Sequence, residues 1–153
     1  LFQISLSIKW VNDLYRNGKK VGGILTEAVT DFETGAIEFA VVGIGLNLFE
    51  PAGGFPEELA RRAGAVFAKG ASVDRNQLLA GIVNRLLEEI ERPGLSSLYV
   101  EKNLVPGHMV QVTTAQRAYK ARALEILPDG RLVVEEQGGK REALRFGDVS
   151  ICM

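Results

Sequence analysis

The sequence predicts an α+β chain in which a glycine-rich sheet and a group of helices precede a small SH3-like β-barrel. Three patterns carry this prediction. Alternating strand-like runs fill the first 50 residues, Leu and Ile recur at helical spacing between 78 and 90, and short strand-like runs return after Val105. Because the period changes near residue 104, we expect one domain over 1–103 and a second over 104–153.

The first third of the chain reads as three or four strands. Residues 4–9 alternate apolar and polar, and Asn17-Gly18 between strand-like arms is typical of a hairpin turn. Gly22-Gly23 lies inside the second arm, which predicts a bulge or a close backbone approach. A turn over 31–35 then leads into a strand over 36–42, which is expected to end in spaced glycines.

Helices are expected in the middle of the chain. Pro56, followed by two acidic residues, predicts a helix through about Phe67. Asp74 begins the clearest helix, which Pro93-Gly94 ends. Its apolar stripe is expected to be core packing, and it comprises Leu78, Leu79, Ile82, Val83, Leu86, Leu87 and Ile90. A short helix over 97–103 should follow.

Five short strands separated by turn residues predict the barrel. They are expected over 109–113, 118–126, 131–136, 143–146 and 149–152. Arg117, Lys120 and Arg122 are interpreted as the solvated face of an edge strand. A role in capping a nucleotide is the alternative for these three cations.

Composition excludes several kinds of site. The 153 residues carry 18 Lys+Arg against 19 Asp+Glu, a formal net charge of −1, which argues against a nucleic-acid or anionic-membrane binder. Single Cys152 and single His108 allow neither an internal disulfide nor a His/Cys metal site, and no residue is assigned to a metal. No apolar run reaches the roughly 18 residues of a membrane span. The cytoplasm is therefore the expected location.

Glycine is in excess: it makes up 17 of the 153 residues, about 11%, against a usual ~7%. Eight of these glycines lie in the first 54 residues, and five of the eight fall in two of three blocks in this region. The blocks are Lys-Trp-Val-Asn-Asp over 9–13, Gly-Lys-Lys-Val-Gly-Gly-Ile-Leu-Thr-Glu over 18–27, and Val-Gly-Ile-Gly-Leu-Asn over 42–47. Together they resemble the biotin protein ligase family, in the family's order and spacing; Val11 stands where most members have Pro. The resemblance implies part of a class II synthetase-like mixed sheet with helices, followed by the family's SH3-like C-terminal domain.

Lys20 is the expected catalytic residue. It follows a tight hairpin and precedes two glycines, so a fixed cation would lie beside exposed backbone, which suits an acyl phosphate or a carboxylate. The alternative is that Lys20 is a solvated hairpin lysine without a catalytic role. This is how we interpret Lys19. The resemblance implies that Lys20 contacts the biotin carbonyl and the adenylate.

The remaining site residues form two groups. Biotin is expected to contact Lys20, Gly22, Gly23, Ile24 and Leu25, the last two as an apolar wall for its ring. The nucleotide is expected to contact Asn12, Gly43, Gly45 and Asn47. Each has a simpler reading: a β-bulge for the glycine pair, and loop hydrogen bonding for the asparagines. Asp13 is interpreted as ordering its turn, and Trp10 as core packing, with stacking near the nucleotide as the weaker alternative.

The resemblance implies an ATP-dependent enzyme, a biotin–[biotin carboxyl-carrier protein] ligase. It would form biotinyl-5′-AMP and transfer biotin to a lysine of a biotin carboxyl carrier protein domain, with Mg²⁺ accompanying ATP. A homodimer is a further expectation. No Gly-Arg-rich adenylate-closing loop occurs in these residues, so we expect a fragment of the catalytic domain, without a DNA-binding domain. Two alternatives stay open: a non-catalytic interaction module and a lipoate-ligase-like relative.

Overall fold

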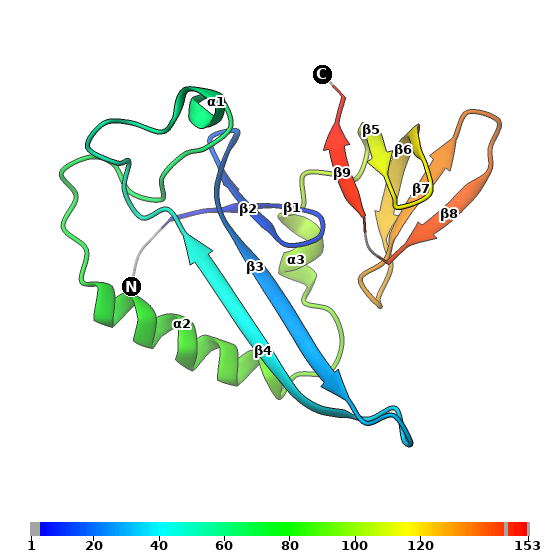
Figure 1. Ribbon diagram of the computed structural model, residues 1–153, viewed down its shortest axis with the longest axis horizontal. Helices are drawn as coiled ribbons and strands as arrows, with labels where there is room; N and C mark the ends of the chain where they lie inside the picture. Colours follow the sequence, from blue (N-terminus) through cyan, green and yellow to red (C-terminus); the bar gives the residue numbers. More distant parts are fainter. Residues whose placement is uncertain (1–3, 146, 153) are drawn as a thin grey trace. The chain divides into compact units, whose positions relative to one another are not determined.

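A computed structural model describes residues 4–145 and 147–152 of the chain (Figure 1). It confirms the α+β class, with two sheets and three helices among these residues. The strands are β1 (Ser7–Lys9), β2 (Asp13–Arg16), β3 (Lys19–Thr30), β4 (Ile37–Leu46), β5 (Met109–Thr113), β6 (Ala118–Ile126), β7 (Leu132–Glu136), β8 (Arg141–Leu144) and β9 (Asp148–Ile151). The helices are α1 (Glu57–Ala60), α2 (Arg75–Ile90) and α3 (Ser97–Glu101).

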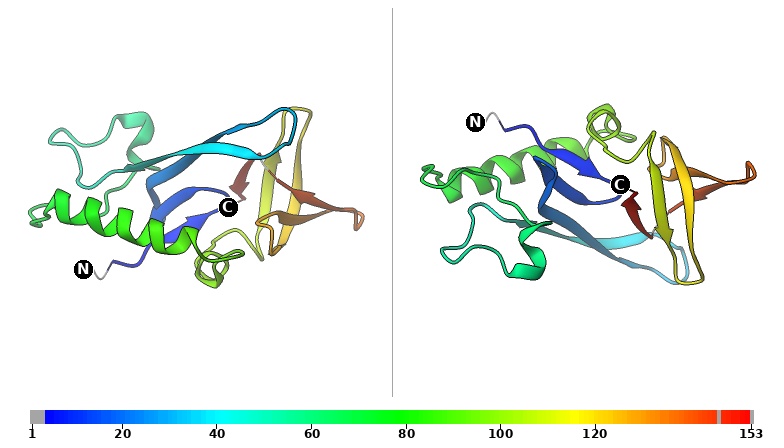
Figure 2. Two further views of the ribbon diagram at one scale, coloured as in Figure 1. Left: turned by 90° about the horizontal axis from the view of Figure 1, so that it is seen from below. Right: turned by 90° about the horizontal axis from the view of Figure 1, so that it is seen from above.

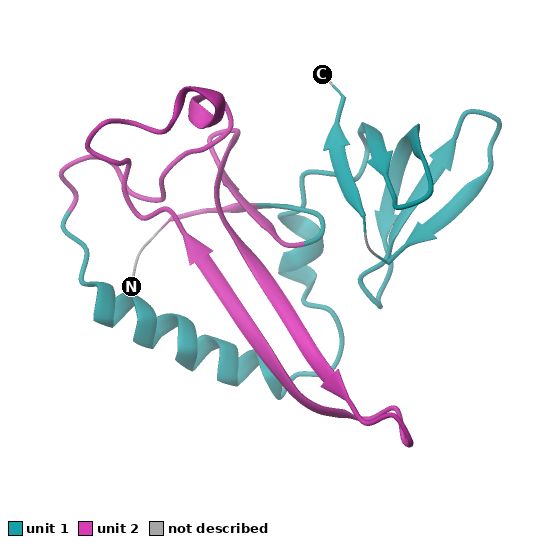
Figure 3. Cartoon of the chain, viewed as in Figure 1, with its two compact units in different colours: residues 1–3, 8–11, 72–153 teal, residues 4–7, 12–71 magenta. Residues whose placement is uncertain are grey.

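The chain divides into two compact units, coloured separately in Figure 3. One, here called the sheet unit, comprises residues 4–7 and 12–71. The other, here called the barrel unit, comprises the described parts of 8–11 and 72–153. The division between 103 and 104 expected from the sequence stays a prediction.

The first sheet has the strand order β1-β2-β3-β4, and the pairings of β3 with β2 and with β4 are antiparallel. Asn17 and Gly18 join β2 to β3 with φ of 50° and 74°, so the predicted two-residue hairpin turn is confirmed. Leu14 pairs with Gly22 while Tyr15 pairs with Lys20, which leaves Val21 as the extra residue of a bulge. The bulge therefore immediately precedes the glycine pair.

Strands β3 and β4 run together as one long ribbon, which Figure 2 shows edge-on. The turn at its end is held by Asp31, whose Oδ1 accepts the backbone N–H groups of Glu33 and Thr34. Strand β4 continues through Gly43 and Gly45 to Leu46, so these glycines lie inside the strand rather than ending it.

The helix expected from Pro56 to Phe67 is limited to α1, because the following residues bond to other parts of the sheet unit. The carbonyl of Arg62 accepts the N–H of Lys20, and the N–H of Gly64 donates to the carbonyl of Lys20. Val66 N–H then donates to the carbonyl of Asn47. Backbone groups that bond across to strands cannot also bond along a helix.

Helix α2 begins where predicted, with Asp74 as its N-cap; the carboxylate accepts the N–H groups of Asn76 and Gln77. The expectation that its apolar stripe is core packing is wrong for this chain, since no residue of α2 is buried. Its exposed members are Leu79, Val83, Leu87 and Ile90. No helix among the described residues is long and apolar enough to cross a membrane.

The second sheet has the strand order β8-β7-β6-β5-β9, and its pairings are antiparallel. All five strands occur where the sequence predicts them, although the expected end of one at Phe146 falls outside the described residues. Its inward side chains form the core of the barrel unit: Val110, Val112, Ala121, Ala123, Leu132, Val134, Leu144 and Val149. Trp10, only 3% exposed, joins this core, and its Nε1–H donates to the carbonyl of Gly130. Core packing is thus the observed role of Trp10.

The expected edge-strand position of Arg117, Lys120 and Arg122 is wrong, because β6, which holds Lys120 and Arg122 and follows Arg117, lies between β5 and β7. Lys120 and Arg122 are exposed, as expected.

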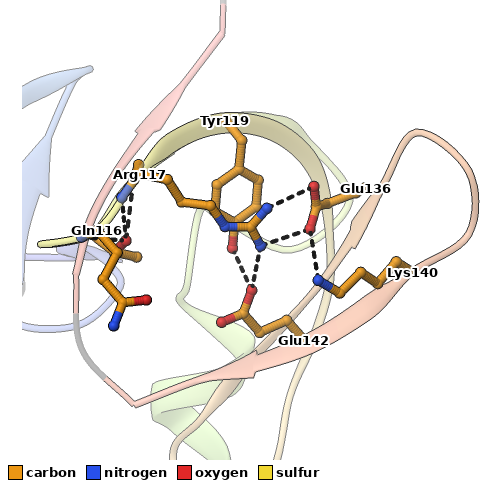
Figure 4. Close-up of polar contacts among 7 residues, drawn as sticks. Gln116, Arg117, Tyr119, Glu136, Lys140 and Glu142 are labelled. Atoms are coloured by element: carbon orange, nitrogen blue, oxygen red, sulfur yellow. Dashed lines mark hydrogen bonds and ion pairs between the residues drawn. The ribbon is translucent and has the colours of Figure 1, made fainter.

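The Arg117 guanidinium donates to both carboxylate oxygens of Glu136 and to Glu142 (Figure 4). It lies 3.9 Å from the centroid of the Tyr119 ring. The Tyr119 hydroxyl also donates to Glu142. These contacts join β6, β7 and β8 on the core-facing side of the sheet, where Glu136 pairs with Ala121 and Glu142 pairs with Val134, so their role is structural.

Candidate functional site

Lys20 is fixed at the start of β3 by its backbone and by its side chain. Its N–H and carbonyl bond to Arg62 and Gly64, at 2.7 and 2.8 Å. Its Nζ lies 2.6 Å from Oδ1 of Asp13, and the two side chains are 47% and 23% exposed. The Lys20 ammonium is therefore held in position by these contacts and is still accessible to an anion that enters from solvent.

Three glycines give the sheet beside Lys20 a floor without side chains. Gly23 pairs with Gly45, and Leu25 pairs with Gly43. Because side chains alternate between the two faces of a strand, Gly23, Leu25, Gly43 and Gly45 share one face. A Cβ built on Gly23 would lie 3.3 Å from Asp13 Oδ1 and 3.7 Å from Lys20 Cε, so the Lys20–Asp13 ion pair borders the same floor.

The apolar wall expected from Ile24 and Leu25 divides between the two faces of β3. Ile24 pairs with Ile44 on the face opposite the glycine floor. Leu25 is on the floor side, where its side chain is 61% exposed. Leu25 is therefore the apolar side chain that borders the floor.

Gly22 has a packing reason of its own. A Cβ at this position would lie 2.4 Å from the carbonyl oxygen of Gly45 and 2.7 Å from Cδ2 of Leu46. The absence of a side chain thus lets β3 and β4 approach each other. Gly22 does not line the cavity described below.

The two predicted asparagines differ in their surroundings. Asn12 forms a reciprocal pair with Ile24: its side-chain Nδ2 donates to the Ile24 carbonyl, and its own carbonyl accepts the Ile24 N–H at 2.9 Å. Asn47 bonds to the 63–66 segment instead, with Nδ2 donating to the Gly64 carbonyl at 3.1 Å. Its contacts are those of an asparagine that holds a loop.

A cavity of ≈ 500 Å³ lies above the glycine floor. It is lined by Asn12, Asp13, Lys20, Gly23, Ile24, Leu25, Gly43, Ile44 and Gly45. The structure therefore gathers residues of all three sequence blocks at one place, and of the predicted site residues it leaves only Gly22 and Asn47 outside. The volume is that of a site for a small organic ligand.

Asp13 and Ile44 were not among the site residues predicted from the sequence. Asp13 lies directly across from Gly23 in the hairpin register. The two-residue turn alone would pair Asp13 with Gly22; the bulge at Val21 moves it to Gly23. The position of Asp13 beside Lys20 can therefore be predicted only if the bulge is included in the strand register.

Lys19 is exposed next to the hairpin turn, as expected of a solvated hairpin lysine, and its side chain also makes a hydrogen bond. Its Nζ donates to the carbonyl of Ala60 at 2.8 Å, and its Cβ lies 2.9 Å from the position that a Cβ on Gly64 would take. Lys19 and Lys20 therefore have separate environments, and only Lys20 borders the glycine floor.

The described residues contain no group of three or more His, Cys, Asp or Glu side chains able to hold a metal ion. Asp13, the one carboxylate that lines the cavity, is paired with Lys20. The cavity thus offers one cation, one paired carboxylate and one amide beside bare backbone. Such a set suits recognition of an anionic, flat ligand.

Comparison with known sequences agrees with this arrangement. Residues 2–47 match the profile of the biotin/lipoate A/B protein ligase family. The bifunctional ligase/repressor BirA of Bacillus spizizenii is 31% identical over 147 residues, covering 89% of this chain and 43% of the relative. The biotin–[acetyl-CoA-carboxylase] ligase of Mycobacterium tuberculosis is 32% identical over 153 residues, covering 93% of this chain and 52% of the relative. The chain thus spans about half the length of these curated relatives.

Comparison with solved structures supports the fold. The apo biotin protein ligase of Aquifex aeolicus superposes with a TM-score of 0.79 at 22% identity, over 98% of this chain and 67% of that one. The same ligase in complex with biotin and ATP gives a TM-score of 0.74 at 24% identity, over 98% of this chain and 63% of that one. Both sheets and the helices of this chain thus follow a known architecture.

Proposed function

This chain belongs to the biotin protein ligase family, and we propose that it carries part of the active site of an ATP-dependent biotin–[biotin carboxyl-carrier protein] ligase. The observation that supports the proposal is the cavity over the glycine floor, where Lys20, Asn12, Gly43 and Gly45 meet from three separate sequence blocks. A cation beside a flat, side-chain-free surface is what a planar acyl adenylate requires.

The proposed reaction has two steps. A carboxylate oxygen of biotin attacks the α-phosphorus of ATP, pyrophosphate leaves, and biotinyl-5′-AMP forms. The amine of a lysine on a carrier protein domain then attacks the acyl carbon; an amide bond forms, AMP leaves and the amine loses a proton. Both steps concentrate negative charge next to the acyl group, on the bridging and phosphate oxygens.

Lys20 is proposed to stabilise that charge. In this structure its ammonium is paired with Asp13. An incoming carboxylate or phosphate would share the ammonium with Asp13, and the backbone bonds to Arg62 and Gly64 would keep the lysine in place. A charge-assisted bond that strengthens as negative charge develops lowers the barrier of both steps.

The other lining residues are proposed to position the two halves of the adenylate. Gly23 and Leu25 would contact biotin, Leu25 as the apolar side chain against its ring, with Ile24 contributing backbone. Asn12, Gly43 and Gly45 would border the nucleotide. Gly22 would act by allowing close strand packing, and Asn47 by holding the 63–66 segment next to Lys20.

Magnesium is proposed to enter with ATP as part of the substrate. The described residues supply no cluster of carboxylates for a resident ion. Mg²⁺ is commonly held by substrate phosphates and water with few protein ligands. No step is therefore assigned to a metal bound by this chain. The carrier domain as partner, a homodimer and a cytoplasmic location are parts of the same proposal.

The test is single-turnover formation of biotinyl-5′-AMP by the complete protein that contains this chain. Lys20→Met is expected to lower the rate by roughly 10²–10³-fold. Lys19→Met is the matched control, because it removes a cation one residue away that does not line the cavity, and it should leave the rate near that of the unmodified protein. Equal rates for the two variants would contradict the role of Lys20.

Ligand binding separates the alternatives. Calorimetry with biotin and ATP should give heat with the unmodified protein, whereas an interaction module without catalytic function would give none. The same assay with lipoate in place of biotin tests the alternative that the chain is a lipoate-ligase-like relative. Adenylate formation with lipoate but not with biotin would replace the proposed substrate while keeping the reaction class.

A further inference from the structure

A second cavity, of ≈ 540 Å³, lies within the barrel unit and has no part in the proposed ligase site. It is lined by Val11, Leu95, Tyr99, Asp129, Gly130, Arg131 and Arg145. Leu95 and Tyr99 pack against the barrel core, so one side of the cavity is apolar and firmly supported. The lining also includes two arginines, Arg131 and Arg145.

Three of the groups that line this cavity already accept hydrogen bonds. The carbonyl of Gly130 accepts the indole N–H of Trp10 at 3.0 Å, and the carbonyl of Val11 accepts the hydroxyl of Tyr99 at 2.8 Å. Asp129 accepts the backbone N–H of Arg131 at 3.2 Å and its Nε–H at 2.6 Å. A ligand that needed acceptors would have to displace one of these bonds.

Donors, in contrast, remain available. Arg145 is exposed, and it has no ion pair among those the structure shows for the described part of the chain. Arg131 is bonded to Asp129 through Nε, and backbone hydrogen bonding from Arg131 lowers the pKa of Asp129, which therefore stays ionised at neutral pH. Two cations and one anion leave the lining with a net charge of +1.

We propose that this cavity binds a small monocarboxylate with an apolar body. The carboxylate would pair with the Arg145 guanidinium, whose planar donor fork matches its two oxygens. The apolar body would cover Leu95, Tyr99 and Val11, and the volume suits a ligand of this size. A single negative charge balances the lining, whereas a dianionic phosphate would add repulsion from Asp129.

The cavity contains its own reporter. Trp10 is the only tryptophan of the chain, and its indole N–H donates to Gly130 on the cavity wall. In a ¹H–¹⁵N spectrum of this chain the Trp10 indole therefore gives the one tryptophan side-chain signal, which a ligand next to Gly130 should shift. Titration with 4-phenylbutyrate should shift this signal saturably, and the neutral 4-phenylbutan-1-ol should bind at least tenfold more weakly.

Three substitutions test the charge argument. Arg145→Gln should weaken binding of 4-phenylbutyrate roughly tenfold, the loss of one charge-assisted pair. Asp129→Asn retains an oxygen for the Arg131 N–H but raises the net charge of the lining, so it should tighten binding. Arg141→Gln is the control, because Arg141 is equally cationic but pairs with Glu135 and lies outside the cavity.

The proposal is overturned if the Trp10 signal does not respond to 4-phenylbutyrate. Equal affinity for the alcohol would also overturn it, as would an unchanged affinity of the Arg145→Gln variant. Because the probe is neither biotin nor a nucleotide and the signal comes from Trp10, the result does not depend on the proposed ligase activity.

Discussion

The Lys20 ammonium lies 2.6 Å from Asp13 Oδ1, at the edge of a floor formed by Gly23, Gly43 and Gly45. The two residues are brought together across a hairpin, by a register that a bulge at Val21 shifts by one position. Asp13 holds the side chain of Lys20 over the cavity before any ligand arrives. In the proposed enzyme, Asp13 is thus a positioning residue for Lys20.

Substitution of Asp13 should therefore act through Lys20. Asp13→Ala is expected to lower the rate of biotinyl-adenylate formation roughly ten- to hundredfold, because the lysine side chain loses its anchor. Asp13→Asn keeps an oxygen acceptor for the lysine, so it should lower this rate less than Asp13→Ala does. Single-turnover kinetics of both variants check this. Adding Asp13→Ala to Lys20→Met should cost little more than Lys20→Met alone, and full additivity would contradict the coupling.

Gly22 and Gly43 should respond differently to alanine. At Gly22 the new Cβ would lie 2.4 Å from the Gly45 carbonyl, so Gly22→Ala should destabilise the fold by about 1–3 kcal/mol. At Gly43 the nearest atom is the Leu25 carbonyl oxygen at 3.7 Å, so stability should hold while ATP affinity falls, because Gly43 is proposed to border the nucleotide. Urea unfolding and calorimetry measure the two effects, and a reversed pattern would contradict the assignment of packing and binding roles.

Arg117 should make stability depend on pH in the acid range. Its hydrogen bonds to Glu136 lower the pKa of that carboxyl below its ordinary value of 4.5. The resulting stabilisation is present above pH 4.5 and is lost as the pH falls through the lowered pKa. The difference in thermal midpoint between the unmodified chain and Arg117→Gln should be largest near neutral pH and shrink below pH 4. A difference that grew on acidification would contradict this linkage.

Substitution of one buried and one exposed leucine should have different effects on stability. Leu132 is fully buried in the barrel unit, so Leu132→Ala should cost about 2–5 kcal/mol. Leu87 on α2 is 60% exposed, so Leu87→Gln should change stability by less than about 0.5 kcal/mol. Denaturant unfolding of this chain measures both. A large loss for Leu87→Gln would mean that another surface covers α2 in solution.

Local patterns predicted the elements that depend on neighbouring residues. The Asn17-Gly18 turn, the Asp74 cap and the five barrel strands all form where expected, because turn geometry and side-chain periodicity are encoded within a few residues. The three blocks also indicated most residues of the candidate cavity. They could not show which of Ile24 and Leu25 shares a face with Gly43 and Gly45, because that requires the pairing with β4.

The sequence by itself thus determined the fold class, the three blocks and Lys20 as the central candidate. Only the tertiary structure decided that 61–67 would leave the helix, that Asn47 would bond to Gly64, and that no residue of the α2 stripe would be buried. It also paired Asp13 with Lys20 through the shifted hairpin register. The reason is physical: the hydrogen-bond partner of a backbone group or amide is chosen among segments distant in sequence. Lys20 illustrates this, because its backbone is held by residues more than forty positions along the chain.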